Sequence, residues 1–243
     1  MAIDSVTFIV PALNENEALA NTLDEIMEIM KSEGSSNYEI LAVNDGSNDE
    51  TGAIADSYAK RYPHIRALHN PSPCGIGQAY KRGIGLTTKK QVMLVHGDNE
   101  IPADSIRKIL RESGAADFVI TYLKNDTRPA ARLVFSKNFT RLVNSLFGLN
   151  VRYYNGPNLI PTKLLKEITI LTDGHAFMAE TIVRLARRGY TFKEVEFSSR
   201  LRVRGRSKAF RIKNILSVLW AILNLHLTLN ARPAPVQAPE KKA

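Results

Sequence analysis

The stretch Gln91–Pro102, QVMLVHGDNEIP, joins a short apolar run to a group of acidic residues just before a proline. The run Val92–Val95 is too short for a helix and partly β-branched, so it predicts a buried strand. Asp98 and Glu100 follow it, and open α/β sheets bind ligands at the carboxyl edge of such strands. Hard oxygen ligands at this spacing suit Mg²⁺ or Mn²⁺ held against a diphosphate. An ordinary acidic turn, with Asp98 as a helix cap, is the open alternative.

Strand-like and helix-like segments alternate along most of the chain. The apolar runs Val6–Val10, Tyr38–Val43 and Ile65–His69 predict strands before the acidic stretch. After it, strands are predicted at Phe118–Tyr122 and Phe192–Phe197. Helices are predicted between and beyond these strands, at Ser105–Leu110 and His175–Arg188 and wherever apolar residues recur at helical spacing, as in Leu19, Leu23, Ile26 and Met30. This alternation predicts an α/β fold with a mostly parallel, three-layer sheet.

Polar residues follow the first two predicted strands. Asn14 and Glu15 open the first helix, and Asp45 lies at the tip of the second strand, where its carboxylate could accept hydrogen bonds from a nucleotide base. For the turn residues next to Asp45, capping of the following helix by Ser47 or Asp49 is the alternative. The glycines that begin with Gly75 could cradle a phosphate, but no complete phosphate-binding motif accompanies them.

Composition bounds the partners and the compartment. The chain has 243 residues, 44% of them hydrophobic, which is enough to bury the core of one domain. Its formal net charge of +9 implies an anionic partner, which could be a nucleic acid, a phosphorylated ligand or an anionic membrane face. The single Cys74 cannot form an internal disulfide. The first residues are too acidic, and their apolar run too short, for a signal peptide, so we expect a cytoplasmic location.

A dense basic run begins at Arg200. Arg200–Lys208 carries five basic residues in nine positions. RNA binding normally adds stacking aromatics or a recognisable module, and neither accompanies this run, so we expect no nucleic-acid partner. A mobile loop that closes on phosphates fits the pattern better.

Two amphipathic segments are candidates for membrane contact. Arg132–Phe147 has one apolar face with basic residues around it, which is typical of a packed helix or of a helix at an anionic membrane. Asn214–Ala231 lacks acidic and strongly basic residues and carries a small or polar stripe, and its length is marginal for a span. We expect an in-plane or packing helix there. The predicted organisation is a catalytic domain over 1–208, this helix within 209–230 and a disordered tail over 231–243.

These residues together resemble a family-2 glycosyltransferase of the GT-A fold, and in particular the polyprenyl-phosphate glycosyltransferases such as the dolichol-phosphate mannosyltransferases. The resemblance runs from about Val6 to Lys208. It rests on P-x-x-N-E at Pro11–Glu15 and on D-G-S at Asp45–Ser47. The stretch His96–Pro102, H-G-D-N-E-I-P, aligns without gaps with the family's D-A-D-L-Q-H-P. The most specific match is E-V at Glu194-Val195 followed by R-x-x-G-x-S-K at Arg202–Lys208. Arg152–Asn158, R-Y-Y-N-G-P-N, departs from the family pattern, which usually reads D-x-x-S-G-F-R there.

The resemblance implies roles for individual residues. The nucleoside pocket would be lined by Pro11, Leu13, Asn14, Glu15, Asp45 and Gly75. Asp98 takes the place of the family's metal-binding acid, with Glu100 and His96 as further metal ligands, although His96 could equally be a satisfied strand-end histidine. Phosphates of donor and acceptor would contact Arg202, Arg204, Ser207 and Lys208. Asp98, Arg202, Lys208 and Glu180 are the implied catalytic residues, with a buried, ion-paired role as the alternative for Glu180.

The expected activity is that of an inverting glycosyltransferase dependent on Mg²⁺ or Mn²⁺. It would move a sugar from a GDP- or UDP-sugar to a polyprenyl phosphate, dolichyl or undecaprenyl, at the cytoplasmic face of a membrane. A transferase acting on a sugar hydroxyl of a polysaccharide or glycolipid is the alternative within enzymes. A basic membrane-surface protein without chemistry is the alternative from another class. The chain could also form a homo-oligomer.

Overall fold

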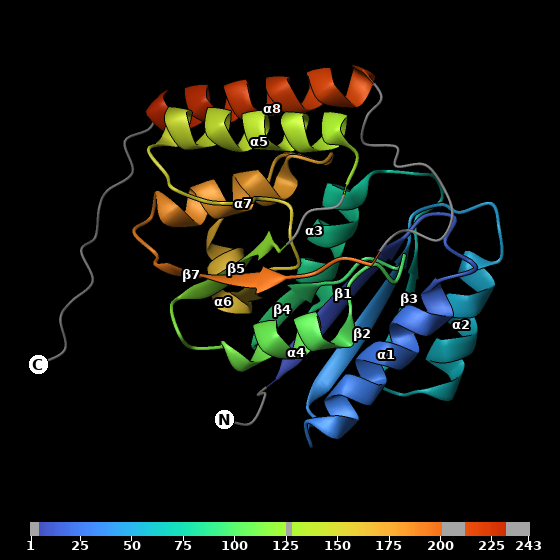
Figure 1. Ribbon diagram of the computed structural model, residues 1–243. Helices are drawn as coiled ribbons and strands as arrows, with labels where there is room; N and C mark the ends of the chain where they lie inside the picture. Colours follow the sequence, from blue (N-terminus) through green and yellow to red (C-terminus); the bar gives the residue numbers. More distant parts are fainter. Residues whose placement is uncertain (1–4, 125–127, 201–211, 232–243) are drawn as a thin grey trace, which may run out of the picture.

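The computed structural model of the chain describes residues 5–124, 128–200 and 212–231. Within these residues a seven-stranded sheet forms the centre of the fold, in the order β3-β2-β1-β4-β6-β5-β7 (Figure 1). Its strands are β1 (Val6–Ala12), β2 (Tyr38–Asn44), β3 (Ile65–His69), β4 (Gln91–Leu94), β5 (Phe118–Leu123), β6 (Leu159–Pro161) and β7 (Phe192–Phe197). All neighbours pair in parallel except β6, which is antiparallel to β4 and β5. The predicted mostly parallel α/β sheet is confirmed.

Helices cover both faces of the sheet. They are α1 (Leu19–Ser32), α2 (Thr51–Arg61), α3 (Ile76–Leu86), α4 (Ala103–Arg111), α5 (Ala130–Phe147), α6 (Thr162–Glu167), α7 (Phe177–Ala186) and α8 (Ile212–Ala231). Alternate side chains of β1 enter two separate cores: Phe8 and Val10 pack with α1, α2 and α4, whereas Ile9 packs with α3, α5, α6, α7 and α8. The strands are therefore buried on both faces, as parallel strands require.

Helices α5 and α8 lie side by side as an outer pair above α7 (Figure 1). The ring of Phe147 at the end of α5 meets the ring of His226 on α8 edge-on, with 5.7 Å between the ring centroids. Val218, Ile222 and Leu225 of α8 are buried against the rest of the core. In the part of the chain that the structure describes, no helix is long and apolar enough to cross a membrane.

The structure differs from the predicted elements at three places. The first helix begins at Leu19 and not at Asn14 and Glu15, whose backbone N–H groups donate to Ser47 and Thr51. The first strand runs through Pro11 to Ala12, because the carbonyl of Pro11 still accepts a hydrogen bond from Gly97 N at 3.0 Å and the chain stays in register with β2. The short elements β6 and α6 have no counterpart in the prediction. Three residues of strand and six of helix are too few to show a period in the sequence.

Candidate active site

The loops after β1 and β2 are joined by hydrogen bonds at the carboxyl edge of the sheet. Asn14 N donates to Ser47 Oγ at 3.0 Å, and Asn48 N donates to Asn14 Oδ1 at 3.0 Å. Glu15 N donates to Thr51 Oγ1 at 2.9 Å. Pro11 is buried at the end of β1, whereas Leu13, Asn14 and Glu15 reach the surface to different extents. The structure thus brings two of the motifs that the sequence singled out onto one edge.

Asp45 is buried at this edge and anchors the loop that follows β3. Its Oδ1 accepts from Asn70 Nδ2 at 2.8 Å and from Cys74 N at 2.9 Å, and its Oδ2 accepts from Gly75 N at 3.0 Å. Both oxygens are therefore engaged within the protein, and a contact from Asp45 to a nucleotide base stays a prediction.

The glycines at the start of α3 allow another segment to approach closely. Gly75 has a φ of +96°, and a Cβ on Gly77 would lie 2.6 Å from the carbonyl oxygen of Thr172. Gly77 N donates to Asp173 O at 2.8 Å, and Lys81 Nζ binds the carboxylate of Asp173. These amides are directed at Asp45 and at the Thr172–Asp173 backbone, so the need for glycine here is explained by packing. The predicted role of Gly75 in nucleotide binding is not tested by these contacts.

The acidic stretch after β4 lies against the end of β1. Gly97 N donates to Pro11 O at 3.0 Å, and a Cβ on Gly97 would lie 2.9 Å from Ala12 Cβ. Only a glycine therefore fits between His96 and Asp98 without a shift of the chain. Asp98 is half-buried, and its Oδ1 accepts from Glu100 N at 3.2 Å. This turn places the Asp98 carboxylate at the same edge as Asn14 and Asp45.

Arg200 fixes the turn of the acidic stretch from the other side, and its importance was missed in the sequence. Its backbone N donates to Glu100 O at 2.7 Å, and its guanidinium donates to Asn99 O at 3.2 Å. The same guanidinium binds both carboxylate oxygens of Glu25, at 2.6 and 2.8 Å. Arg200 was counted only as part of the basic run, although it is the residue that ties the chain after β7 to the acidic turn. The predicted phosphate contacts of Arg202, Arg204, Ser207 and Lys208 lie outside the described residues.

The acidic stretch can supply a carboxylate ligand to a divalent metal at this edge of the sheet. Among the described residues, no three His, Cys, Asp or Glu side chains are placed to hold a metal ion. The predicted set of His96, Asp98 and Glu100 stays a prediction, and within it Asp98 Oδ1 accepts a hydrogen bond from Glu100 N at 3.2 Å. Desolvation lowers the pKa of His175, and the charges of His96 and Arg132 lower it further. Mg²⁺ is often held by one or two carboxylates together with substrate phosphates, and Asp98 can supply such a carboxylate.

Glu180 is a buried, ion-paired carboxylate in α7. It accepts hydrogen bonds from Leu171 N at 3.0 Å, from Thr172 N at 2.8 Å and from Arg184 Nε at 2.7 Å. Only 3% of its side chain is exposed, which leaves no free face for a substrate. These contacts agree with the alternative for Glu180, which was a buried carboxylate in an ion pair. A catalytic role for Glu180 stays a prediction.

The segment that departs from the family pattern is held between β5 and β7. Glu194 Oε1 accepts from Arg152 N at 2.7 Å, and its Oε2 lies 3.2 Å from Arg152 Nε. Asn158 is buried with its Oδ1 bound to Thr121 N at 2.9 Å, and a Cβ on Gly156 would lie 2.0 Å from Thr121 Oγ1. Because β6 is antiparallel, Asn158 at its beginning lies at the same sheet edge as the ends of β4 and β5. The Gly-Pro turn before it was the only signal of this placement in the sequence.

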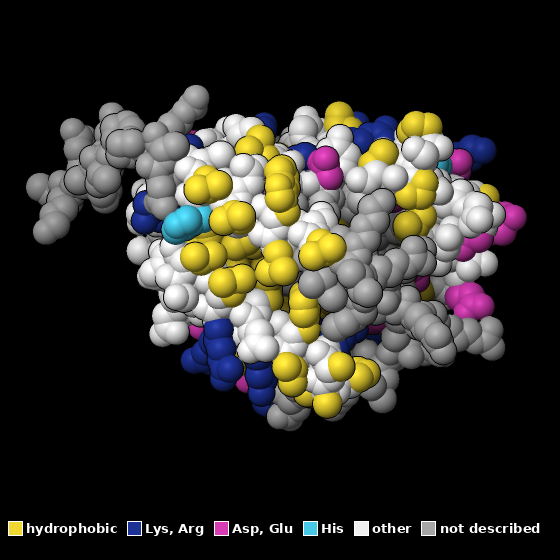
Figure 2. Space-filling model, turned by 90° about the horizontal axis from the view of Figure 1, so that it is seen from above, with side chains coloured by type: hydrophobic (Ala, Val, Ile, Leu, Met, Phe, Trp, Pro, Cys, Tyr) yellow, Lys and Arg dark blue, Asp and Glu magenta, His cyan; other side chains and the backbone are white. Residues whose placement is uncertain are grey.

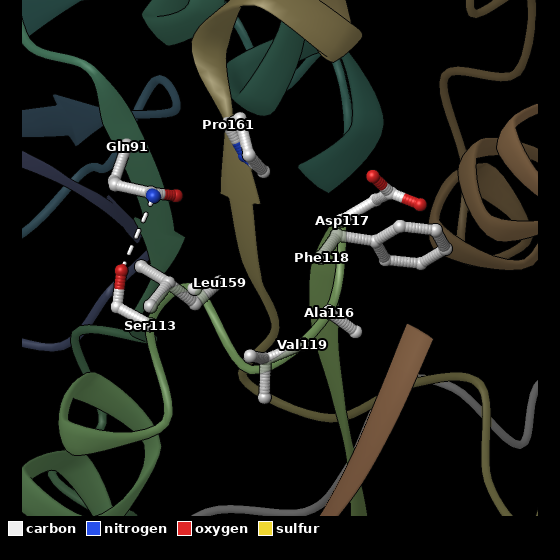
Figure 3. A pocket seen from close by; sticks show the side chains of 9 residues that line it. Gln91, Ser113, Ala116, Asp117, Phe118, Val119, Leu159 and Pro161 are labelled. Carbon is white, nitrogen blue, oxygen red and sulfur yellow. Dashed lines mark hydrogen bonds between the residues drawn. The ribbon is translucent and has the colours of Figure 1, made fainter. Parts of the chain in front are cut away.

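A small cavity of about 90 Å³ lies away from this edge (Figure 3). Its lining includes Gln91, Asp117, Phe118 and Pro161, which mark the beginnings of β4 and β5 and the end of β6. Gln91 Nε2 donates to Ser113 Oγ across it at 3.2 Å (Figure 3). This cavity is therefore at the amino edge of the sheet and is not part of the candidate site.

Comparison with known proteins agrees with the fold. Residues 7–179 match the model of glycosyl transferase family 2, and the chain belongs to this family. The structure is similar to mannosyl-3-phosphoglycerate synthase from Rubrobacter xylanophilus, with a TM-score of 0.76 and 16% identity over 98% of this chain and 79% of that one. It is also similar to glucosyl-3-phosphoglycerate synthase from Mycobacterium tuberculosis in complex with Mn²⁺, uridine-diphosphate-glucose and phosphoglyceric acid, with a TM-score of 0.72 and 14% identity over 96% of this chain and 81% of that one. The predicted GT-A fold is thereby confirmed.

Two curated relatives bear on the acceptor. Dolichyl-phosphate beta-glucosyltransferase ALG5C from Trichomonas vaginalis is 34% identical over 107 residues, which are 42% of this chain and 32% of that protein. The match thus spans about a third of that relative's length. Undecaprenyl-phosphate mannosyltransferase from Micrococcus luteus is 27% identical over 84% of this chain and 86% of its own length. The predicted similarity to polyprenyl-phosphate glycosyltransferases is confirmed.

Proposed function

We propose that the chain is an inverting glycosyltransferase that moves a sugar from a nucleotide-diphosphate donor to a polyprenyl phosphate. An oxygen of the acceptor phosphate attacks the anomeric carbon of the sugar as the bond from that carbon to the diphosphate breaks on the opposite side. The products are the polyprenyl phosphosugar and the nucleoside diphosphate. Polyprenyl-phosphate acceptors in the names of two relatives support this choice of acceptor.

The observation that carries the proposal is that Glu180 and Asp173, the two carboxylates that we consider as candidate general bases, are both engaged in contacts within the protein. A sugar hydroxyl must lose a proton as it attacks and needs a positioned general base. Glu180 is buried with three hydrogen bonds, and Asp173 is paired with Lys81. A phosphate monoester, with a second pKa near 6, is already an anion at neutral pH and requires cations more than a base. The arrangement therefore favours a phosphate acceptor over a hydroxyl.

The donor is assigned to the edge formed by the loops after β1, β2 and β4. Asn14, Glu15 and Asp45 lie on the nucleoside side of this edge, and Asp98 lies where a divalent ion would join the protein to the diphosphate. When bound, Mg²⁺ or Mn²⁺ neutralises the charge that develops on the leaving diphosphate. Similar solved structures hold Mn²⁺ or Mg²⁺ together with uridine diphosphate. Arg202, Arg204, Ser207 and Lys208 are assigned to the phosphates of donor and acceptor.

A transfer assay tests the acceptor. The full chain is supplied with a labelled nucleotide sugar, Mn²⁺ and either a short polyprenyl phosphate or the matching polyprenyl alcohol. We expect product only with the phosphate, and we expect Arg202→Ala and Lys208→Ala to reduce turnover far more than Glu180→Gln. Reaction of the alcohol alone, with Glu180→Gln or Asp173→Asn as damaging as Arg202→Ala, would replace the proposal with a hydroxyl-directed transferase.

A thermal-shift panel tests the donor and the metal. GDP, UDP, CDP and dTDP are each added with and without Mn²⁺, because a ligand that binds the folded state raises its stability by mass action. We expect one nucleotide to stabilise the chain more than the others and to need the metal for its full effect. In Asp98→Asn the Mn²⁺-dependent part of the shift should be lost. An unchanged Mn²⁺ effect in that variant would remove Asp98 from the metal site, and the absence of any nucleotide effect in the parent would favour a non-catalytic surface-binding protein.

A further inference from the structure

One face of α8 is apolar and is not covered by the other residues that the structure describes. Leu216, Leu219, Trp220, Leu223 and Leu227 recur at helical spacing, and 43–68% of each residue is exposed. They are opposite to the buried row of Val218, Ile222 and Leu225. The spacing of the exposed residues is that of a continuous helical stripe, so their exposure is not scattered. A contiguous apolar surface of this kind usually marks an interaction site.

The neighbouring helix α5 extends this face and adds positive charge. Val134 and Leu142 are exposed hydrophobic residues of α5, and Lys137 and Arg141 are exposed on the same helix. Hydrophobic side chains gather over this pair of helices, with Lys and Arg side chains at the border of the patch (Figure 2). Neither α5 nor α8 contains an Asp or a Glu. The outer surface of the pair is thus apolar, and the charged side chains that these two helices contribute are all basic.

The charge of the whole chain is concentrated in the segments that contain these two helices. Residues 127–166 and 197–239 together hold 15 Lys and Arg and no Asp or Glu. The remaining residues hold 18 basic and 24 acidic side chains. The net charge of +9 therefore comes from the segments that include α5 and α8, while the rest of the chain is acidic.

We propose that the α5–α8 face, formed by the exposed apolar residues of both helices with Lys137 and Arg141, docks in the plane of an anionic lipid bilayer. Amphipathic helices with apolar residues on one side and basic residues at the border bind the headgroup region in this way, and Trp is favoured at that depth. A second copy of the chain fits this face less well. A two-fold contact would bring the basic borders of both copies together, which repels.

The face is continuous with the candidate active site. A Cβ on Gly174 would lie 3.8 Å from Ser217 Oγ of α8, and Gly174 follows the Thr172–Asp173 segment that packs on the start of α3. Gly77, at the start of α3, in turn donates its backbone N–H to the carbonyl oxygen of Asp173 at 2.8 Å. A lipid with its chain in the bilayer would therefore present its phosphate beside these residues. This step rests on the proposed function, whereas the docking surface does not.

Vesicle flotation with the full chain tests the surface. The protein is mixed with phosphatidylcholine vesicles or with vesicles that also contain phosphatidylglycerol. We expect flotation with the anionic vesicles and weaker flotation in high salt or without phosphatidylglycerol. Trp220→Ser/Leu223→Ser should lower the partition coefficient tenfold or more, because it removes exposed apolar contacts. These residues are on the surface, so the variant should unfold at the same temperature as the parent.

Matched charge variants separate the effect of the basic residues on α5 from the effect of the net charge of the chain on vesicle binding. Lys137→Glu/Arg141→Glu should weaken binding to anionic vesicles by about tenfold or more. Lys31→Glu/Lys60→Glu changes the net charge equally on exposed positions of α1 and α2 and should retain most of the binding. Equal losses in the two double variants would show that only overall charge attracts the chain and would overturn the proposal.

Two further outcomes would also overturn the proposal that the α5–α8 face docks on a bilayer. One is a parent chain that does not float with anionic vesicles. The other is a parent dimer that Trp220→Ser/Leu223→Ser converts to monomers, since the face would then join two copies. The nucleotide thermal shift serves as an independent readout. Vesicle binding without any nucleotide effect would support the proposed docking surface and contradict the proposed transferase. A nucleotide effect without vesicle binding would contradict only the docking surface.

Discussion

At the scale of single residues, the ion pair of Glu180 and Arg184 is the contact whose loss should be felt most strongly in the fold. Glu180→Ala would leave the guanidinium of Arg184, whose side chain is 12% exposed, without its partner and would free the amides of Leu171 and Thr172. Breaking a buried pair from one side costs about 3–5 kcal/mol. Urea denaturation should show a loss of this size, whereas Lys81→Ala should cost less than about 1 kcal/mol because its partner Asp173 is 59% exposed. A loss below about 1 kcal/mol in Glu180→Ala would contradict the structural role.

Substitution of Asp45 is expected to affect both the stability of the fold and the binding of the nucleotide. Asp45→Ala removes acceptors from Asn70 Nδ2, Cys74 N and Gly75 N, so the loop after β3 should loosen and the free energy of unfolding should fall. If Asp45 also contacts the nucleotide, binding should weaken by about 1.5–3 kcal/mol more than in Asn70→Ala, which disturbs the same loop but keeps the carboxylate. Isothermal titration with the preferred nucleotide measures both variants. Equal affinities would leave Asp45 with the anchoring role alone.

At the scale of elements, the glycines of α3 offer a matched pair of substitutions. A Cβ on Gly77 would lie 2.6–2.8 Å from backbone atoms of Thr172 and Asp173, whereas a Cβ on Gly85 in the same helix meets nothing within 4 Å. Gly77→Ala should destabilise the fold by about 1–3 kcal/mol. Gly85→Ala should stabilise it by up to about 1 kcal/mol, because alanine is the better helix former. Thermal unfolding of both variants checks the contrast, and equal shifts would show that the Thr172–Asp173 segment yields easily.

The elements also show what could be predicted from the sequence and why. Long segments with a clear period, such as β1, α1 and β2, were predicted to within a few residues. Asp45 and Asp98 were placed at the carboxyl edge of the sheet because each follows a predicted strand. The antiparallel β6 could not be predicted, because three residues have no period and their pairing with β4 and β5 is a tertiary event. The partners of Glu180 and Arg200 are distant or backbone atoms, which a pattern of residue types does not specify. The metal set of His96, Asp98 and Glu100 stays a prediction, since spacing along the chain does not determine where side chains turn.

At the scale of the whole molecule, α8 contributes side chains both to the core and to the proposed docking surface. An experiment that tests the docking surface must therefore leave the buried side chains of α8 in place. Deleting Leu216–Ala243 would remove the outer apolar row, but it would also remove Val218, Ile222 and Leu225 from the core. Each buried side chain of this size contributes roughly 1.5–3 kcal/mol, and typical domains have only about 5–15 kcal/mol in total. The truncated chain should therefore unfold at a clearly lower temperature and expose the inner faces of α5 and α7. Trp220→Ser/Leu223→Ser should instead release the chain from vesicles with its unfolding temperature and nucleotide-induced shift unchanged. Differential scanning calorimetry of both variants measures the difference, and a truncated chain as stable as the parent would show that α8 packs too weakly to belong to the core.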